Sequence, residues 1–73
     1  MINPTTVKHA YVQYKDLRTM RKEYAPAYIV RGRVYPARTT RYKTATAALA
    51  HSRMFLAAWQ ERWDARQAQE ATV

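Results

Sequence analysis

The sequence contains no cysteine, a single glycine and only five acidic residues. The lack of cysteine excludes disulfides and thiolate metal sites within the chain. One glycine is too few for a glycine-rich phosphate-binding loop. No apolar run approaches the roughly 20 residues of a membrane span, and Met1–Val12 lacks the apolar stretch of a signal peptide. We therefore expect a protein of a reducing compartment with no membrane span.

The few acidic and histidine residues also argue against catalysis. His9 and His51 are far apart in the sequence, and the carboxylates are scattered, so the spacing of a metal site is missing. Ser52 follows His51, but adjacent helical residues point about 100° apart and do not form a base–nucleophile pair. A chain of 73 residues also has little room for a catalytic pocket. We expect no enzyme activity, no metal and no cofactor.

Basic residues are abundant and unevenly distributed. Thirteen Lys and Arg give a net charge of +8, with a net +9 in residues 1–58 and a net −1 in residues 59–73. Such a basic body favours an anionic partner: nucleic acid, an anionic lipid surface or an acidic protein surface. The apolar content of 48% predicts a folded domain. We expect one small domain over residues 1–67 and a frayed tail over residues 68–73.

The clearest element is a long helix from Thr44 to about Gln67. This segment has no glycine or proline, and good helix formers dominate it. Its apolar residues recur every three or four positions, which is the spacing of one helical stripe. Thr44 or Thr46 can cap its start. Because the helix is long for so small a chain, part of it is expected to lack cover.

The N-terminal third predicts a second helix, from Pro4 to Lys22. Asn3 suits the cap, Pro4 suits the first helical position, and apolar residues follow at spacings of three and four up to Pro26, before which the helix must end. The alternative is a strand at His9–Tyr14, where β propensity is high. The longer periodic pattern favours the helix.

A hairpin is expected around the only glycine. A two-residue turn at Arg31–Gly32 pairs Val30 with Arg33, Ile29 with Val34 and Tyr28 with Tyr35. Arg31 suits such a turn poorly, so a longer, bulged loop is the alternative. Arg38–Lys43 alternates and is a candidate third strand. The predicted fold is α+β: an N-terminal helix, an antiparallel hairpin or three-stranded sheet with Ile29 and Val34 on the first turns of the long helix, then that helix.

Two groups of cations are candidate contacts for an anionic partner, and two tryptophans are candidate contacts for a protein groove. Arg31 and Arg33 are expected to be exposed at the turn, whereas the neighbouring tyrosines are better explained by packing. A few cations near a helix end would favour its dipole, but a cluster of four exceeds that need. The tryptophans fit a docking helix end and the core equally well. The predicted partner-binding residues are Lys15, Arg18, Arg21, Lys22, Arg31, Arg33, Trp59 and Trp63.

Two resemblances suggest partners. A small sheet running into a helix, as in Tyr28–Trp59 with its RYKTATAALAH segment, resembles the arm-binding domains of phage integrases, which implies a DNA-binding module. Over its whole length, and in stretches such as YAPAYIVRGRVYPAR and MFLAAWQERWDARQ, the chain resembles small transcription regulators of lytic bacteriophages, as found in a Xanthomonas phage.

The second resemblance implies a specific activity. Such a regulator binds the β and β′ subunits of bacterial RNA polymerase near the RNA exit channel, in the host bacterial cytoplasm. It displaces the σ factor, inhibits initiation at host promoters and promotes antitermination, without catalysis. A basic protein suits a channel that carries RNA. Contact with exit RNA or with DNA is a further expectation, and no membrane or small-molecule substrate is implied.

Overall fold

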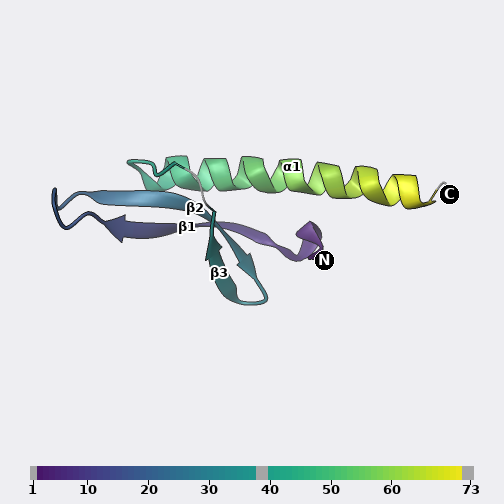
Figure 1. Ribbon diagram of the computed structural model, residues 1–73, viewed down its shortest axis with the longest axis horizontal. Coiled ribbons are helices and arrows are strands. Elements are labelled where there is room, and N and C mark those ends of the chain that lie inside the picture. The colour runs from purple at the N-terminus through teal and green to yellow at the C-terminus, as the bar shows by residue number, and fades with distance from the viewer. Residues whose placement is uncertain (1, 38–39, 72–73) are drawn as a thin grey trace.

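The fold is a small antiparallel sheet with one long helix beside it, in a computed structural model that describes residues 2–37 and 40–71. The elements are the 3-10 turn η1 (Pro4–Thr6), strands β1 (Lys8–Lys15), β2 (Lys22–Val30) and β3 (Arg33–Pro36), and helix α1 (Ala45–Ala71). The strand order is β1-β2-β3, and α1 lies along β1 and β2 (Figure 1). The predicted α+β class is therefore confirmed.

The predicted N-terminal helix over Pro4–Lys22 is wrong. Asn3 does cap a turn, because its Oδ1 accepts the Thr5 N–H at 3.0 Å, but that turn ends at Thr6. β1 then pairs with β2 in continuous antiparallel register, so the alternative strand at His9–Tyr14 is correct. Ala10 and Tyr14 fit both periods: together with Val12 they alternate as in a strand, and together with Tyr11 they recur at helical spacing. Pairing with β2 decides between the two periods.

The break expected before Pro26 is also wrong, because Pro26 lies inside the central strand, where proline is uncommon. Its carbonyl accepts the Ala37 N–H at 2.9 Å, but proline has no N–H to return. The regular ladder between β2 and β3 ends at this point, at the pair Ala27 and Pro36. Pro26 thus sets the length of β3.

The β2–β3 hairpin has the predicted register: Val30 faces Arg33, Ile29 faces Val34, and Tyr28 faces Tyr35. Arg31 and Gly32 have φ values of 52° and 79°, so both lie in the left-handed region. Two such residues form the type I′ turn that matches the twist of the strands. The bulged loop is therefore not used, and Arg31 accepts a conformation in which Asn or Gly is usual.

The candidate strand at Arg38–Lys43 is reduced to one bridge in the part of the chain that is described. Tyr42 and Tyr24 exchange two backbone hydrogen bonds of 2.8 and 2.7 Å. Residues 38–39 lie outside the described residues. The third strand of the sheet is instead β1, which the helix prediction had concealed.

The long helix is confirmed and exceeds its predicted length. Thr44 caps its start, since Thr44 Oγ1 accepts the Ala47 N–H at 3.1 Å. The helix continues to Ala71, beyond the expected end at Gln67, and residues 72–73 of the predicted tail lie outside the described residues. At 1.5 Å per residue α1 is about 40 Å long, which accounts for most of the 55 Å long axis of the molecule.

The core consists mainly of alanine, proline and serine with one valine, Val7, whereas we expected Ile29 and Val34 to form it. Ala25, Ala27, Ala48 and Ser52 are buried, and half of the Val34 side chain is exposed. Small side chains allow the helix to approach the sheet closely. Ser52 is 0% exposed, and its hydroxyl donates to the Ala27 carbonyl at 2.5 Å and accepts the Ala10 N–H at 3.2 Å.

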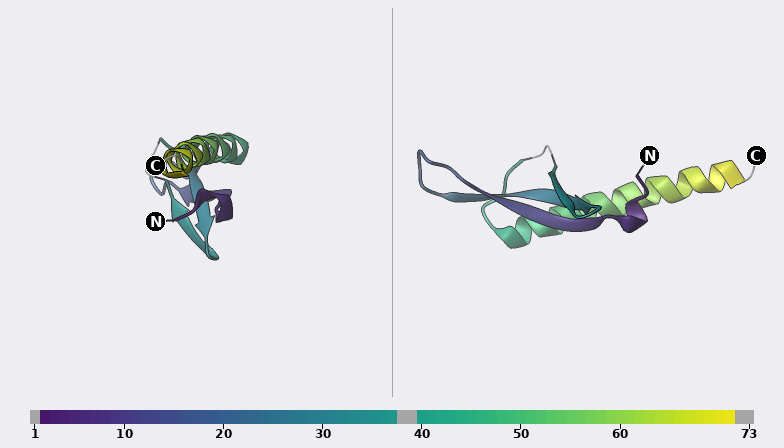
Figure 2. Two further views of the ribbon diagram at one scale, coloured as in Figure 1. Left: turned by 90° about the vertical axis from the view of Figure 1, so that its right-hand side faces the viewer. Right: turned by 90° about the horizontal axis from the view of Figure 1, so that it is seen from below.

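Ala10 and Ala27, the two partners of the Ser52 hydroxyl, face each other across the β1–β2 ladder. The Ser52 hydroxyl therefore lies at the joint between two strands and joins both of them to α1. This places the helix at a defined position along the sheet. The two ends of the molecule overhang: the β1–β2 turn projects beyond the start of α1, and the last turns of α1 project beyond the strands (Figures 1 and 2).

Candidate binding surfaces

Four of the predicted partner-binding cations gather at one end of the molecule. Lys15 ends β1, Arg18 and Arg21 lie in the connecting turn, and Lys22 begins β2; all four are exposed. We call residues 15–22 the hairpin tip. The sequence grouped these cations correctly but on a helix, whereas the structure arranges them around one turn. The tip lies at the opposite end of the long axis from the C-terminal end of α1 (Figure 1).

Asp16 gives the hairpin tip a defined conformation. Its backbone N–H donates to the Arg21 carbonyl at 2.9 Å, and its carbonyl accepts the Met20 N–H at 2.7 Å. Its carboxylate accepts the Arg18 N–H at 2.9 Å. The one acidic residue of the tip therefore forms its hydrogen bonds within the turn, which is a typical role of Asp in turns. The four cations face solvent.

Two apolar side chains at the hairpin tip were missed by the sequence analysis. Leu17 is 80% exposed and Met20 is 62% exposed. The helical pattern had placed both on a buried stripe. In a turn they are instead surrounded by cations, so the tip combines apolar and positive surface. A hollow of about 570 Å³ beside it is lined by Met20, Arg21, Lys22, Glu23 and Lys43.

The acidic member of that hollow is balanced by its own cation. Glu23 forms an exposed ion pair with Arg41 at 3.1 Å. The Arg41 guanidinium also lies 4.3 Å from the centre of the Tyr14 ring, within cation–π range. Glu23 therefore adds little negative potential to the hairpin tip, and the end of the molecule remains basic.

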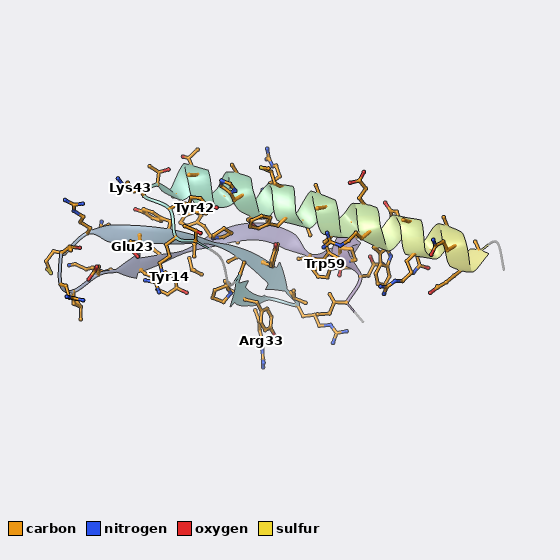
Figure 3. The ribbon with its side chains drawn as sticks, turned by 45° about the horizontal axis from the view of Figure 1, so that its top comes forward. Tyr14, Glu23, Arg33, Tyr42, Lys43 and Trp59 are labelled. Atoms are coloured by element: carbon orange, nitrogen blue, oxygen red, sulfur yellow. The ribbon has the colours of Figure 1, made fainter. Side chains whose placement is uncertain are left out.

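The β2–β3 turn presents the second predicted pair of cations. Arg31 and Arg33 are both exposed, as the turn predicted, and Arg33 points away from the body of the molecule (Figure 3). Seen from the side, this turn projects away from α1 (Figure 1). An open hollow of about 470 Å³ is lined by Ile2, Val30, Arg31, Arg33 and Tyr35.

The predicted tryptophans form a third surface together with two arginines that the sequence analysis did not select. A hollow of about 330 Å³ is lined by Trp59, Arg62, Trp63 and Arg66, which we call the Trp–Arg groove. Both indoles are half-buried. The four positions recur at i, i+3, i+4 and i+7, which is one stripe of a helix. That spacing was the available signal, and counting only apolar residues concealed it.

The two tryptophans differ in their support. Trp59 meets the Tyr28 ring edge-on, with centroids 6.0 Å apart and planes at 74°. Beside it, the Thr5 hydroxyl donates to Gln60 Oε1 at 3.2 Å, which joins η1 to the helix. Trp63 lies one turn further along α1. Trp59 therefore packs on the folded body through Tyr28, and the docking interpretation stays a prediction for both tryptophans.

The pKa of Tyr28 is influenced by a charge that lies beside the groove. Burial raises the pKa of the Tyr28 phenol above its ordinary value, and the nearby Arg62 guanidinium opposes this shift because it favours the phenolate. Arg62, which lines the groove, is thus close enough to Tyr28 to influence its pKa. The groove is positive as well as aromatic.

The remaining tyrosines mostly serve packing, as expected. Tyr42 stacks on His51 with centroids 4.3 Å apart and planes at 13°, and Tyr11 meets Tyr24 edge-on at 5.9 Å. His51 therefore faces a ring while Ser52 is bound into the sheet, so the two neighbours have separate partners. Tyr11 and Tyr35 are nevertheless exposed, at 44% and 50%.

The described residues offer no alternative site chemistry. Within residues 2–37 and 40–71, no three His, Asp or Glu side chains are grouped to hold a metal ion. In the same part of the chain, no helix is both long and apolar enough to cross a membrane. Comparisons with protein-family models, with curated proteins and with solved structures found no match.

Proposed function

We propose that this chain is a phage transcription regulator that binds host bacterial RNA polymerase near the RNA exit channel. In this role it displaces the σ factor, which inhibits initiation, and it promotes antitermination. One observation carries the proposal: the basic hairpin tip and the Trp–Arg groove lie toward opposite ends of a molecule 55 Å long. That arrangement suits a protein that bridges two surfaces, here the β and β′ subunits.

The choice of partner depends on the resemblance of the chain to small phage regulators of polymerase. The structure supports bridging in a physical sense. The Ser52 hydroxyl and the paired strands hold the two surfaces at a fixed separation. A stiff bridge loses little conformational entropy on binding and therefore binds more tightly than a flexible one.

Neither proposed effect requires catalysis. Displacement of σ needs competition for a shared surface of the polymerase, which is a difference between two affinities. Antitermination needs a bound protein that favours one conformation of the polymerase and occupies space where a terminator hairpin would form. A net charge of +8 also speeds the approach to an acidic surface or to a channel that carries RNA.

A pull-down tests the partner. The immobilised chain should retain polymerase β and β′ subunits from a bacterial lysate treated with nuclease, and added σ factor should compete for that retention. If an untreated lysate yields nucleic acid but no polymerase subunits, the proposal is contradicted.

A matched pair of variants tests the surface. Arg18→Ala/Arg21→Ala and Lys8→Ala/Arg53→Ala each remove two exposed cations, so their net charges are equal. Only the first pair should weaken the binding of purified polymerase. Equal losses would mean that total charge, not the hairpin tip, determines binding.

The second candidate function is a small DNA-binding module. One observation favours it: a three-stranded antiparallel sheet runs into a helix, the order seen in the arm-binding domains that the chain resembles. Against it, most of the exposed cations selected above lie at the two turns. This candidate requires strong binding to bare duplex DNA, with an affinity that falls steeply as salt rises. The absence of a salt-dependent shift of duplex DNA would remove it.

A further inference from the structure

We propose that the Trp–Arg groove is a binding site for single-stranded nucleic acid, in which bases stack on the indoles and phosphates pair with the guanidinium groups. The proposal rests on the proposed function and deepens it, because an exit channel carries a single-stranded transcript: this end of the chain faces a polymerase subunit, and the groove holds the transcript beside it. Its test needs no polymerase, since it concerns the residues of one helix face: Trp59, Arg62, Trp63 and Arg66.

The aromatic part of the groove offers two separate stacking positions. Trp59 is held by the edge-on contact with Tyr28, so its plane is fixed before any ligand binds. Trp63 lies about 6 Å further along the axis, at 1.5 Å per residue. An aromatic ring stacks on any base, because every base has a π face, and such stacking is the usual way in which proteins hold single strands.

The charged part of the groove fits a phosphate backbone. Arg62 and Arg66 line the same hollow as the two indoles, and a guanidinium group can pair with phosphate through two parallel hydrogen bonds. Two of the nearby acids lie off this stripe: at 3.6 residues per turn, Glu61 and Asp64 are about 200° and 140° around the helix from Trp59. Asp64 in addition accepts a hydrogen bond from Gln60 at 3.0 Å. Glu70, one turn beyond Arg66 on the same stripe, bounds the site.

The groove suits a single strand better than the other anionic ligands. A duplex keeps its bases stacked inside, where they cannot reach an indole. An acidic peptide could pair with the arginines but has no planar rings to use two half-exposed tryptophans. The hollow of about 330 Å³ also lies at the lower end of the range for small-ligand sites, which suits a base and its phosphate.

Intrinsic fluorescence gives a direct test, because the chain has only two tryptophans and both line the groove. The full chain is titrated with a short oligouridylate, with an RNA duplex and with polyglutamate. The oligouridylate should quench the fluorescence by stacking, and the other two should not. Quenching that is equal with polyglutamate, or no quenching by the oligouridylate at low salt, would overturn the proposal.

Variants then assign the contacts, with affinity read from the anisotropy of a labelled oligouridylate. Trp63→Ala should weaken binding about 5- to 150-fold, the range that loss of one stacked base implies. Trp63→Phe should restore most of the affinity, because it keeps a stacking ring. Circular dichroism shows that each variant is folded. Unchanged affinity of a folded Trp63→Ala would contradict the proposal.

A charge-matched pair tests the phosphate contact. Arg62→Ala and Arg53→Ala each remove one cation from α1, but Arg53 does not line the groove. Arg62→Ala should lower the slope of log affinity against log salt by about 0.7, the value for one phosphate of a single strand. Equal effects of the two variants would reduce the binding to general attraction and overturn the proposal. Because no polymerase is present, the result is independent of the pull-down.

Discussion

Removal of the Ser52 hydroxyl should destabilise the protein by about 2 kcal/mol, although Ser52→Ala deletes a single atom. Each hydrogen bond contributes about 0.5–1.5 kcal/mol, and a buried donor left unpaired costs about 1–3 kcal/mol. The hydroxyl makes two bonds at a site with no exposed surface, to Ala27 and to Ala10. At 0.05–0.15 kcal/mol per residue, the total stability is only about 4–11 kcal/mol.

Urea unfolding followed by circular dichroism measures this cost. The midpoint should fall without a change in slope, because the surface exposed on unfolding is almost unaltered. Thr46→Ala is the matched control: it removes an exposed hydroxyl from the same helix and should stay within about 0.5 kcal/mol of the wild type. If Ser52→Ala costs no more than Thr46→Ala, the strands have closed directly on each other and the hydroxyl does not hold the helix to the sheet.

Three further predictions concern the tip, the tight turn and a buried phenol. Leu17→Ser/Met20→Ser should leave urea stability within about 0.5 kcal/mol yet weaken polymerase binding by more than about 1 kcal/mol, since both side chains are exposed; full binding would exclude the tip. Gly32→Ala should lower the free energy of unfolding by about 1–2 kcal/mol, because φ is +79° there, although the added Cβ would meet nothing within 4 Å. Arg31→Asn should instead stabilise the type I′ turn. An unchanged stability of Gly32→Ala would contradict this prediction. Burial raises the folded-state pKa of Tyr28, so the protonated phenol contributes its full share of stability below about pH 10, and this share is lost as the pH rises through the folded pKa. Above about pH 10 the wild type should therefore lose more urea stability than Tyr28→Phe. Equal losses in the two proteins would refute this prediction.

The elements with strong local signals could be predicted from the sequence. The long helix has continuous helix formers and a capping threonine, Thr44, and the β2–β3 hairpin has one glycine between strands that match residue for residue. In both cases the information lies within a few neighbouring residues. Local sequence and tertiary contacts then agree, and the prediction succeeds.

The prediction of β1 failed because the apolar pattern of this segment is compatible with two periods. Ala10, Val12 and Tyr14 alternate as in a strand, whereas Ala10, Tyr11, Tyr14 and Leu17 recur at helical spacing. The choice is made by the backbone pairing with β2, which covers all of β1 and which the pattern within β1 does not reveal. The core was missed for a related reason. Alanine and serine carry no strong burial signal, and Ser52 becomes buried only because two alanines of the sheet allow a close approach.

The candidate surfaces were predicted in part, and the reason again lies in geometry. A cluster of cations in the sequence is a cluster in space whether its segment forms a helix or a turn, so the grouping at the tip survived the wrong assignment. Leu17 and Met20 were lost with that assignment, because a helix hides the side chains that a turn exposes. Arg62 could have been predicted only by asking which charged residues share a helical stripe with the aromatic ones.

The length of α1 now has a physical explanation that differs for each tryptophan. Trp59 packs on Tyr28 at the level where η1 meets the helix, so it belongs to the folded body. Trp63 lies one turn beyond, and its indole lines the groove. Truncation of Trp59 should therefore reduce stability, by roughly 3 kcal/mol or more if it behaves like a core aromatic. Truncation of Trp63 should mainly reduce binding. The core interpretation therefore applies to the contact of Trp59 with Tyr28, and the docking interpretation applies to the parts of both indoles that line the groove.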